Sequence, residues 1–327
     1  MMDHFTSKAW MKNPHIQTAL GSLRLRVLGK NPMAACAKEI IIDAGCGVRL
    51  LGYHSAQPSD KSKGLITLLH GWEGSSDSAY ILSTGKYLYG KGYDIFRLNL
   101  RDHGASHHLN EGMFHGALIE ETYNAVMRIS ELSNGRPNYV VGFSLGGNFA
   151  LRIVLHQNAS SSIPNLKHVF CISPPLDPYK ATLAIDNGLP VYRLYFLKKW
   201  KRSLKKKQML FPRQYDFGHI LKMRTCMEMT EAIMPYYPAF LNYREYFNQY
   251  TLGNSQFENI STPTTVIVAE DDPVISVRDF STLKTSPHVS LLIQKNGGHC
   301  GFFISSPFDC WYEKKISHII RKDECRK

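Results

Sequence analysis

The sequence predicts an α/β fold in which a mostly parallel, doubly wound sheet is interrupted by one helical insertion. Short apolar and β-branched runs alternate with helix-compatible stretches between residues 64 and 172, which is the pattern of repeated β-α-β units. The alternation then stops until residue 264, and the stretch between holds aromatic and basic helical segments without a convincing strand. A length of 327 residues with 43% hydrophobic residues is enough for one large core carrying such an insertion.

The first expected elements are two short strands between residues 38 and 55, which form an antiparallel hairpin around Gly45-Cys46-Gly47. The main sheet follows. Its expected strands cover residues 64–69, 93–98, 138–142 and 166–172, and helices are expected near residues 78–90, 117–132 and 146–157. Because each strand is followed by a helix that leads to the next strand, these strands are expected to run parallel.

Prolines mark the place where the pattern breaks. Ser173-Pro174-Pro175-Leu176-Asp177-Pro178 ends any regular element, and strands resume at residues 264–269 and 288–294. We therefore expect an α/β core in two parts, residues 1–173 and 262–327, with a helical lid inserted at residues 174–261 after the sixth strand.

The most informative motif is Gly142-Phe143-Ser144-Leu145-Gly146, which lies between a β-branched run and a helix-compatible run. A sharp strand-turn-helix with serine at its apex is typical of a nucleophile elbow. The turn holds Ser144 in a strained conformation, and the close approach of the flanking chain favours glycine at residues 142 and 146. A chance match in a glycine-containing turn is the alternative, and the strand-turn-helix context disfavours it.

A serine nucleophile needs a histidine base and a carboxylate that orients it, which follow in the order serine, acid, histidine in such folds. The apolar strand 264–269 ends in Glu270-Asp271-Asp272-Pro273, and we assign the acid to Asp272 because it directly precedes the proline turn. Asp271 and Glu270 are expected only to end the strand and solvate the loop. His299 lies in a glycine-flanked loop after the next strand, and its position predicts the base.

Two backbone N–H groups are candidates for an oxyanion hole. Leu145 follows the serine at a helix start, and Trp72 follows Gly71 in a turn after strand 64–69. Gly71 is expected to let the backbone turn tightly there. His70 is expected to be a structural residue of that turn, since His299 already supplies the base.

These motifs resemble the YheT-like branch of the α/β-hydrolases, which is related to the abhydrolase-domain esterases and phospholipases. The matching segments are residues 13–18, 70–76, 142–148, 173–177, 271–273 and 297–302. The resemblance implies an α/β-hydrolase fold and carboxylic-ester hydrolysis, phospholipid deacylation or acyl transfer to an alcohol. One departure, Leu100-Arg101-Asp102-His103-Gly104-Ala105-Ser106, replaces a turn of many relatives and bears on substrate preference.

Composition limits the other functional classes. No run approaches the length of a transmembrane helix, and the first ten residues lack the apolar region of a signal peptide. Seven scattered cysteines without a CxxC pair favour reduced thiols, and thus a cytoplasmic protein. Cys300 is not expected to be a nucleophile because it lacks an elbow. No dinucleotide fingerprint or phosphate loop is present, so no cofactor is expected.

The net charge of +12 is concentrated rather than general. No acid lies between Asp186 and Asp216, whereas nine bases do. These are Arg193, Lys198, Lys199, Lys201, Arg202, Lys205, Lys206, Lys207 and Arg213. A general excess would favour nucleic acid, whereas one patch on an insertion favours a surface contact, so no nucleic-acid partner is expected.

The same segment predicts a basic amphipathic helix. Leu194, Leu197, Trp200 and Leu204 recur at helical spacing, with lysines and Arg202 on the other faces. Two interpretations remain open: a lid helix that packs on the core, or peripheral contact with anionic membrane. A second stretch, residues 234–247, is rich in aromatics and is expected either to line an apolar acyl pocket or simply to pack in the core.

Other functions remain as alternatives. Asp102, His103, His107, His108 and His115 are residue types that bind zinc, but a serine triad needs no metal and the loop looks flexible, so no metal site is expected. An acyltransferase would share the acyl-enzyme and differ only in the second nucleophile. A catalytically idle hydrolase fold that serves as a binding protein is the non-enzymatic alternative. We expect a serine esterase that acts on short- to medium-chain acyl esters or lipids.

Overall fold

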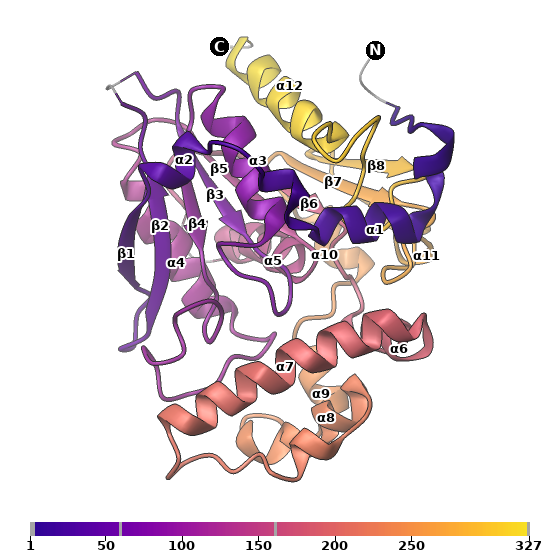
Figure 1. Cartoon of the computed structure of the whole chain (residues 1–327). Helices are drawn as coiled ribbons and strands as arrows, with labels where there is room; N and C mark the ends of the chain where they lie inside the picture. Colours follow the sequence, from indigo (N-terminus) through magenta and orange to yellow (C-terminus); the bar gives the residue numbers. More distant parts are fainter. Residues whose placement is uncertain (1–3, 59–60, 160–161, 326–327) are drawn as a thin grey trace.

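The computed structural model describes residues 4–58, 61–159 and 162–325, so the first three residues of the segment inspected for a signal peptide lie outside it. Its centre is an eight-stranded sheet in the order β1-β2-β4-β3-β5-β6-β7-β8. The strands are β1 (Lys38–Asp43), β2 (Arg49–Ser55), β3 (Leu65–Leu69), β4 (Asp94–Leu98), β5 (Asn138–Phe143), β6 (Leu166–Ile172), β7 (Thr264–Ala269) and β8 (Val289–Gln294). This architecture confirms the predicted fold class (Figure 1).

Strand direction follows the prediction. β1 pairs with β2 antiparallel, with Ile41 opposite Leu51, and β2 pairs antiparallel with β4. Every later neighbour is parallel, from β4-β3 through β7-β8. The central strands β3, β4, β5 and β7 are buried along their whole length, as expected for parallel strands that are covered on both faces.

Helices pack on both faces of the sheet. The helices α3 (Ala79–Tyr89) and α12 (Trp311–Cys325) contribute to one apolar cluster with Ile66, Val141 and Ile267. The helices α4 (Ile119–Glu131) and α5 (Leu145–Ala159) contribute to a second cluster with Leu65, Val140 and Val266. Because neighbouring strand residues point to opposite faces, each central strand supplies side chains to both clusters.

All the regular elements between β6 and β7 are helices. They are α6 (Pro178–Asn187), α7 (Pro190–Leu210), η3 (Ile220–Lys222), α8 (Cys226–Ile233), η4 (Met234–Tyr236), α9 (Tyr243–Asn248) and α10 (Asn254–Glu258). Figure 1 shows α6 to α9 as a layer at one end of the core, with α7 lying across the core side of that layer. Local sequence fixes these helices: Asp177 caps α6, Pro190 begins α7, and Thr225 with Glu228 forms a capping box on α8.

The N-terminal segment crosses the end of the core near β8. It contains η1 (Ala9–Lys12), α1 (Pro14–Ser22), η2 (Arg24–Val27) and α2 (Pro32–Ala35), and the short α11 (Arg278–Ser281) follows β7. Asn13 caps α1 by accepting hydrogen bonds from the N–H groups of His15 and Ile16. Among the described residues, no helix is long and apolar enough to cross a membrane.

Candidate active site

Ser144 lies at the turn between β5 and α5, with a φ of 51° that is rare for a residue other than glycine. The flanking glycines are required by close approach. A Cβ on Gly142 would lie 2.2 Å from the Gly146 carbonyl oxygen, and a Cβ on Gly146 would lie 2.4 Å from the Leu69 carbonyl oxygen. Positions 142 and 146 therefore have no room for a side chain, and this close packing against the sheet holds the strained turn.

A continuous hydrogen-bonded chain joins the three residues that the sequence predicts. His299 Nε2 lies 2.9 Å from Ser144 Oγ, and His299 Nδ1 lies 2.8 Å from Asp272 Oδ2. The Asp272 carboxylate also accepts hydrogen bonds from the N–H groups of Val274 and Ile275 in the proline turn. The carboxylate is 1% exposed, so water does not compete for it. Such a chain can remove a proton from the serine and stabilise the imidazolium that results.

Asp271 does more than the sequence indicated. Its carboxylate accepts a hydrogen bond from the Gly298 N–H at 2.9 Å and lies 3.3 Å from Asn296 Nδ2. The expectation that it only ends the strand and solvates the loop was therefore wrong. Burial raises the pKa of Asp271, and the bond from Gly298 opposes that rise. Asp271 thus binds the backbone of the loop that carries His299, and Asp272 binds the His299 ring.

The two candidate oxyanion donors lie beside the serine. Trp72 and Leu145 line the same pocket as Ser144, and neither N–H donates to a protein acceptor among the described residues. Gly71 is needed for a reason other than the one expected. A Cβ there would lie 3.1 Å from Ser144 Cβ and 3.3 Å from the Phe143 carbonyl oxygen, so close approach rather than turn geometry favours glycine. Glu73 instead carries the left-handed backbone of this turn, with φ 55°.

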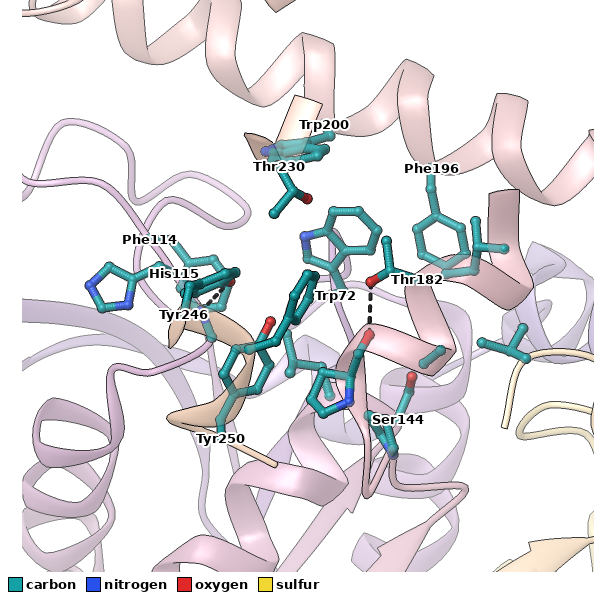
Figure 2. A pocket seen from close by; sticks show the side chains of 18 of the residues that line it. Trp72, Phe114, His115, Ser144, Thr182, Phe196, Trp200, Thr230, Tyr246 and Tyr250 are labelled. Carbon is teal, nitrogen blue, oxygen red and sulfur yellow. Dashed lines mark hydrogen bonds between the residues drawn. The ribbon is translucent and has the colours of Figure 1, made fainter. Parts of the chain in front are cut away.

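An apolar pocket of about 90 Å³ opens above Ser144, between the core and the inserted helices. Figure 2 shows Ser144 at its base, Trp72 at its centre, and Phe196 and Trp200 reaching in from α7. Tyr237, Tyr246 and Phe247 of the predicted aromatic stretch also line it. Phe240 and Leu241 of that stretch do not, and Leu241 is 92% exposed.

Comparisons with known proteins identify the family of this chain. The family model described as alpha/beta hydrolase fold matches residues 64–306. The chain belongs to the α/β-hydrolase fold family. It is 22% identical to a monoacylglycerol lipase of Saccharomyces cerevisiae, over 80% of this chain and 60% of the relative, and 24% identical to phospholipase ABHD3 of Mus musculus, over 77% and 61%. The chain thus spans about three-fifths of the length of these relatives.

A solved structure shows the same fold. A Pyrococcus furiosus esterase superposes with a TM-score of 0.58 at 15% identity, covering 88% of this chain and 92% of the esterase. A putative esterase of Synechocystis sp. is 23% identical in sequence, over 80% of this chain and 76% of that protein. The predicted relationship to abhydrolase-domain esterases and phospholipases is confirmed at family level, whereas the YheT-like branch stays a prediction.

In this α/β-hydrolase, the N-terminal helix α1 holds the histidine loop, a role that we did not predict. Thr18 Oγ1 accepts a hydrogen bond from the His299 N–H at 2.9 Å and donates one to the Pro14 carbonyl at 2.7 Å. The buried Gln17 side chain bonds to both the N–H and the carbonyl of Phe303. The motif at residues 13–18 was the available signal, but only the fold shows that it meets residues 298–303.

The loop after β4 is anchored, which corrects the expectation of a flexible loop. The Asp102 carboxylate pairs with Lys207 of α7 at 2.9 Å, and both side chains are buried. His103 and His107, two of the candidate zinc ligands, are bonded to the Arg101 carbonyl and to Ser203 Oγ. Burial lowers the pKa of His103 to about 4 and that of His107 to about 3. Within the described ranges, no group of three or more His, Cys, Asp or Glu residues is arranged to hold a metal.

Helix α7 faces the core differently from the prediction. Leu197, Trp200 and Leu204 are buried, but Leu194 is 61% exposed and lies outside the buried stripe. Several cations also point inward. Lys199 donates to the Glu73 carbonyl, Lys201 donates to the Met223 carbonyl, and Lys207 is buried. Lys199 thus binds the residue that follows Trp72, and the Phe196 ring stacks on the Trp72 ring with their centroids 5.1 Å apart. Helix α7 therefore packs against the turn that carries the candidate oxyanion donor.

Cys300 and His70 have structural surroundings. The Cys300 thiol is buried against the Ile172 carbonyl, and burial raises its pKa, so the thiolate is disfavoured. His70 is fully buried, with Nδ1 near the Gly71 carbonyl and Nε2 accepting from the Leu100 N–H. Burial lowers its pKa, which keeps the ring neutral in the role of a turn residue.

Proposed function

We propose that this α/β-hydrolase is a serine esterase that cleaves carboxylic esters through an acyl-enzyme. The observation that carries the proposal is the hydrogen-bonded chain from Ser144 through His299 to Asp272 at the base of an apolar pocket. Ser144 Oγ attacks the acyl carbon while His299 Nε2 takes its proton. His299 then returns that proton to the leaving alcohol, and Asp272 stabilises the imidazolium in between.

The negative charge that develops on the acyl oxygen must be stabilised by hydrogen-bond donors that are already in place. We assign this role to the N–H groups of Leu145 and Trp72, which lie beside Ser144 in the pocket wall. Leu145 is the first residue of α5, where the helix dipole favours negative charge. Water then attacks the acyl-enzyme by the same steps in reverse, with His299 as its base.

Replacement of Ser144 by Ala tests the assignment. Turnover of a short p-nitrophenyl ester should fall by several orders of magnitude, and labelling by a fluorophosphonate probe should disappear. Ser255→Ala is the matched control, because Ser255 is exposed on α10 away from the pocket. Retained turnover in Ser144→Ala would refute the mechanism. Absence of labelling in the unmodified protein would favour the idle, binding-protein alternative.

The substrate class follows from the pocket and from the relatives. The pocket is largely apolar and, at about 90 Å³, small beside the roughly 300–1,000 Å³ of typical ligand pockets. A lipase and a phospholipase are among the relatives. We therefore propose short- to medium-chain acyl esters or lipids, with residues 174–261 acting as the lid. A panel of esters and phospholipids of increasing chain length should give its highest kcat/KM at short chains.

Acyl transfer is the second candidate reaction. Hydrolysis and transfer share the acyl-enzyme, and only the nucleophile of the second step differs. Adding a primary alcohol during turnover and measuring the ratio of acid to new ester distinguishes them. A dominant ester product at millimolar alcohol would show that transfer is the main reaction.

Peripheral contact with anionic membrane is proposed for the outer face of α7. This face carries exposed Val191 and Leu194 next to exposed Lys198 and Lys205. Apolar side chains beside cations are typical of helices that lie at a lipid interface. Each cation near an anionic surface contributes about 1 kcal/mol. The apolar part of this face is therefore distinct from the inward stripe of Leu197, Trp200 and Leu204.

Sedimentation with vesicles of increasing anionic lipid content tests the contact. Lys198→Gln with Lys205→Gln should weaken binding at low salt, whereas Lys30→Gln with Lys284→Gln, exposed elsewhere, removes the same charge and should not. If the two double variants bind alike, or if the protein does not sediment at low salt, the membrane role is rejected.

A further inference from the structure

A second cavity, of about 480 Å³, lies on the other side of the turn that carries Trp72. Its walls come from residues 73–80 of that turn, residues 102–107 after β4, one face of α7, and Ser22 with Arg24 near the end of α1. Trp72, Phe196 and Trp200 line the apolar pocket but not this cavity. The turn that carries Trp72 and helix α7 therefore separate the two cavities, and each contributes residues to both.

Four cations line this second cavity, and none of them has a carboxylate partner in the part of the chain that the structure describes. They are Arg24, Lys199, Arg202 and Lys206. Lys199 donates to the Glu73 carbonyl and Lys206 to the Gly104 carbonyl, so both remain charged donors with further capacity. Such a group of unpaired cations repels itself, and an anion in the cavity would relieve that repulsion.

The three carboxyl groups in the walls do not neutralise these cations. Asp77 is paired with Arg97 at 3.0 Å, and Asp102 is paired with Lys207 at 2.9 Å. Burial raises the pKa of Glu73 to about 8, so this carboxyl is mostly protonated near neutral pH and can donate a hydrogen bond. At that pH the cavity therefore keeps a positive excess.

The start of helix α3 adds further hydrogen-bond donors to the cavity wall. Ser78, Ala79 and Tyr80 begin α3 at the cavity wall, and the first turn of this helix has neither an acidic residue nor a side-chain cap.

We propose that this cavity binds a phosphate group, and that the substrate class includes phosphate-bearing acyl esters such as an acylated glycerol phosphate. The guanidinium of Arg202 matches phosphate oxygens with paired donors, and Lys206, Lys199 and the start of α3 supply the remaining contacts. The assignment to substrate rests on the proposed esterase function, whereas the phosphate site itself does not.

Titration with inorganic phosphate tests the site without catalysis. In a Ser144→Ala background, calorimetry should detect binding, and Arg202→Gln with Lys206→Gln should weaken it about tenfold or more. Lys198→Gln with Lys205→Gln is the matched control, because these residues lie on the same helix and remove the same charge but do not line the cavity. Absence of binding, or equal losses in both double variants, would overturn the proposal.

A pair of esters then distinguishes the source of the phosphate. The unmodified enzyme should turn over 1-butyrylglycerol 3-phosphate with a kcat/KM about tenfold above that of 1-butyrylglycerol, and the Arg202/Lys206 double variant should lose this preference. A preference that disappears in the double variant supports a substrate site. Equal turnover of the two esters, with phosphate binding retained, overturns the substrate assignment and leaves a site for free phosphate. Turnover of neither ester would reject the esterase function while the calorimetry still decides the site.

Discussion

At the scale of single residues, neighbouring side chains of the same type have different tasks. Asp271 and Asp272 follow Glu270 just after the end of β7, yet only Asp272 reaches the His299 ring, while Asp271 holds the loop through Gly298. The turn at Pro273 explains the difference, because Asp272 accepts two backbone N–H groups beyond the proline and its carboxylate is fixed toward the histidine. A difference of one position in the chain therefore decides whether the carboxylate contacts the histidine ring or the backbone of the histidine loop.

Substitution of each aspartate by Asn should separate the two tasks. Asp272→Asn loses the negative partner of His299 and should lower kcat by about 10³–10⁴-fold. Asp271→Asn keeps a carbonyl oxygen for the Gly298 N–H and should cost about tenfold or less. Steady-state kinetics on one short ester measures both. The reverse order would assign the acid to Asp271.

Thr18 is expected to act as a positioning residue for His299. Thr18→Val keeps the shape but removes the acceptor of the His299 N–H, so kcat should fall about tenfold while KM changes little. Thr18→Ser restores the oxygen and should recover most of the activity. Thermal unfolding of both variants is the companion measurement. If Thr18→Ser is as slow as Thr18→Val, packing of the methyl group rather than the hydrogen bond is responsible.

At the scale of elements, helix α7 connects the insertion to both walls of the site. Its N-terminal part meets α1, where Tyr192 Oη lies 2.8 Å from His15 Nδ1. Its middle covers Trp72 with Phe196 and Trp200. Its C-terminal part is held by Lys207, which bonds to Asp102 and to the carbonyls of Asn110 and Gly112. These contacts join the insertion to the loops after β3 and β4 rather than leaving it free.

Loss of the Lys207–Asp102 pair should therefore destabilise the protein. Lys207→Met leaves the Asp102 carboxylate buried without its partner and should cost about 3–5 kcal/mol in urea unfolding. Adding Asp102→Asn removes the stranded charge, so the double variant should be more stable than the sum of the single effects predicts. Lys205→Met, exposed on the same helix, should change stability by about 0.5 kcal/mol or less. Strict additivity would show that the pair is not coupled.

At the scale of the whole molecule, the sheet separates two apolar cores and the site forms where the insertion meets one of them. The cluster that contains Leu145, Trp200 and Tyr250 runs from the core into the inserted helices. Because this cluster is continuous, stability of the insertion and of the core should be linked in one unfolding transition. Buried polar groups at the junction then influence the stability of the whole chain.

Glu73 should make that stability depend on pH. Its pKa is about 8 in the folded protein, against an ordinary value of 4.5, because burial disfavours the charged form. Between these values the folded state holds a proton that the unfolded state releases, so stability falls as pH rises from about 4.5 to 8. Glu73→Gln cannot ionise. Its Tm should match the unmodified protein near pH 5 and exceed it at pH 8–9, by about 2 °C for each kcal/mol regained.

Calorimetric scans across this pH range measure the effect. Glu258→Gln, exposed on α10, serves as the control for the loss of a carboxylate and should show no trend of this kind. A constant difference between Glu73→Gln and the unmodified protein from pH 5 to 9 would contradict the assigned protonation.

Much of the fold could be predicted from local sequence. The strands were located because buried parallel strands are continuous apolar runs, and the elbow was located because close approach at Gly142 and Gly146 restricts both positions to glycine. The spacing of Ser144, Asp272 and His299 was also visible, since each follows a strand that ends at the same edge of the sheet. Each of these patterns involves residues that are close together in the sequence, so the sequence alone reveals them.

Only the tertiary structure decided which side chains meet across the chain. The contact of Thr18 with His299, the burial of Lys207 against Asp102, and the outward direction of Leu194 each depend on how distant elements pack. Helical spacing alone predicted an apolar stripe with solvated lysines, but a helix that lies between a core and other helices buries more than one face. Sequence thus determined the elements and the proposed nucleophile, while packing between distant segments determined the pocket, the supports of the candidate site and the positive cavity beside it.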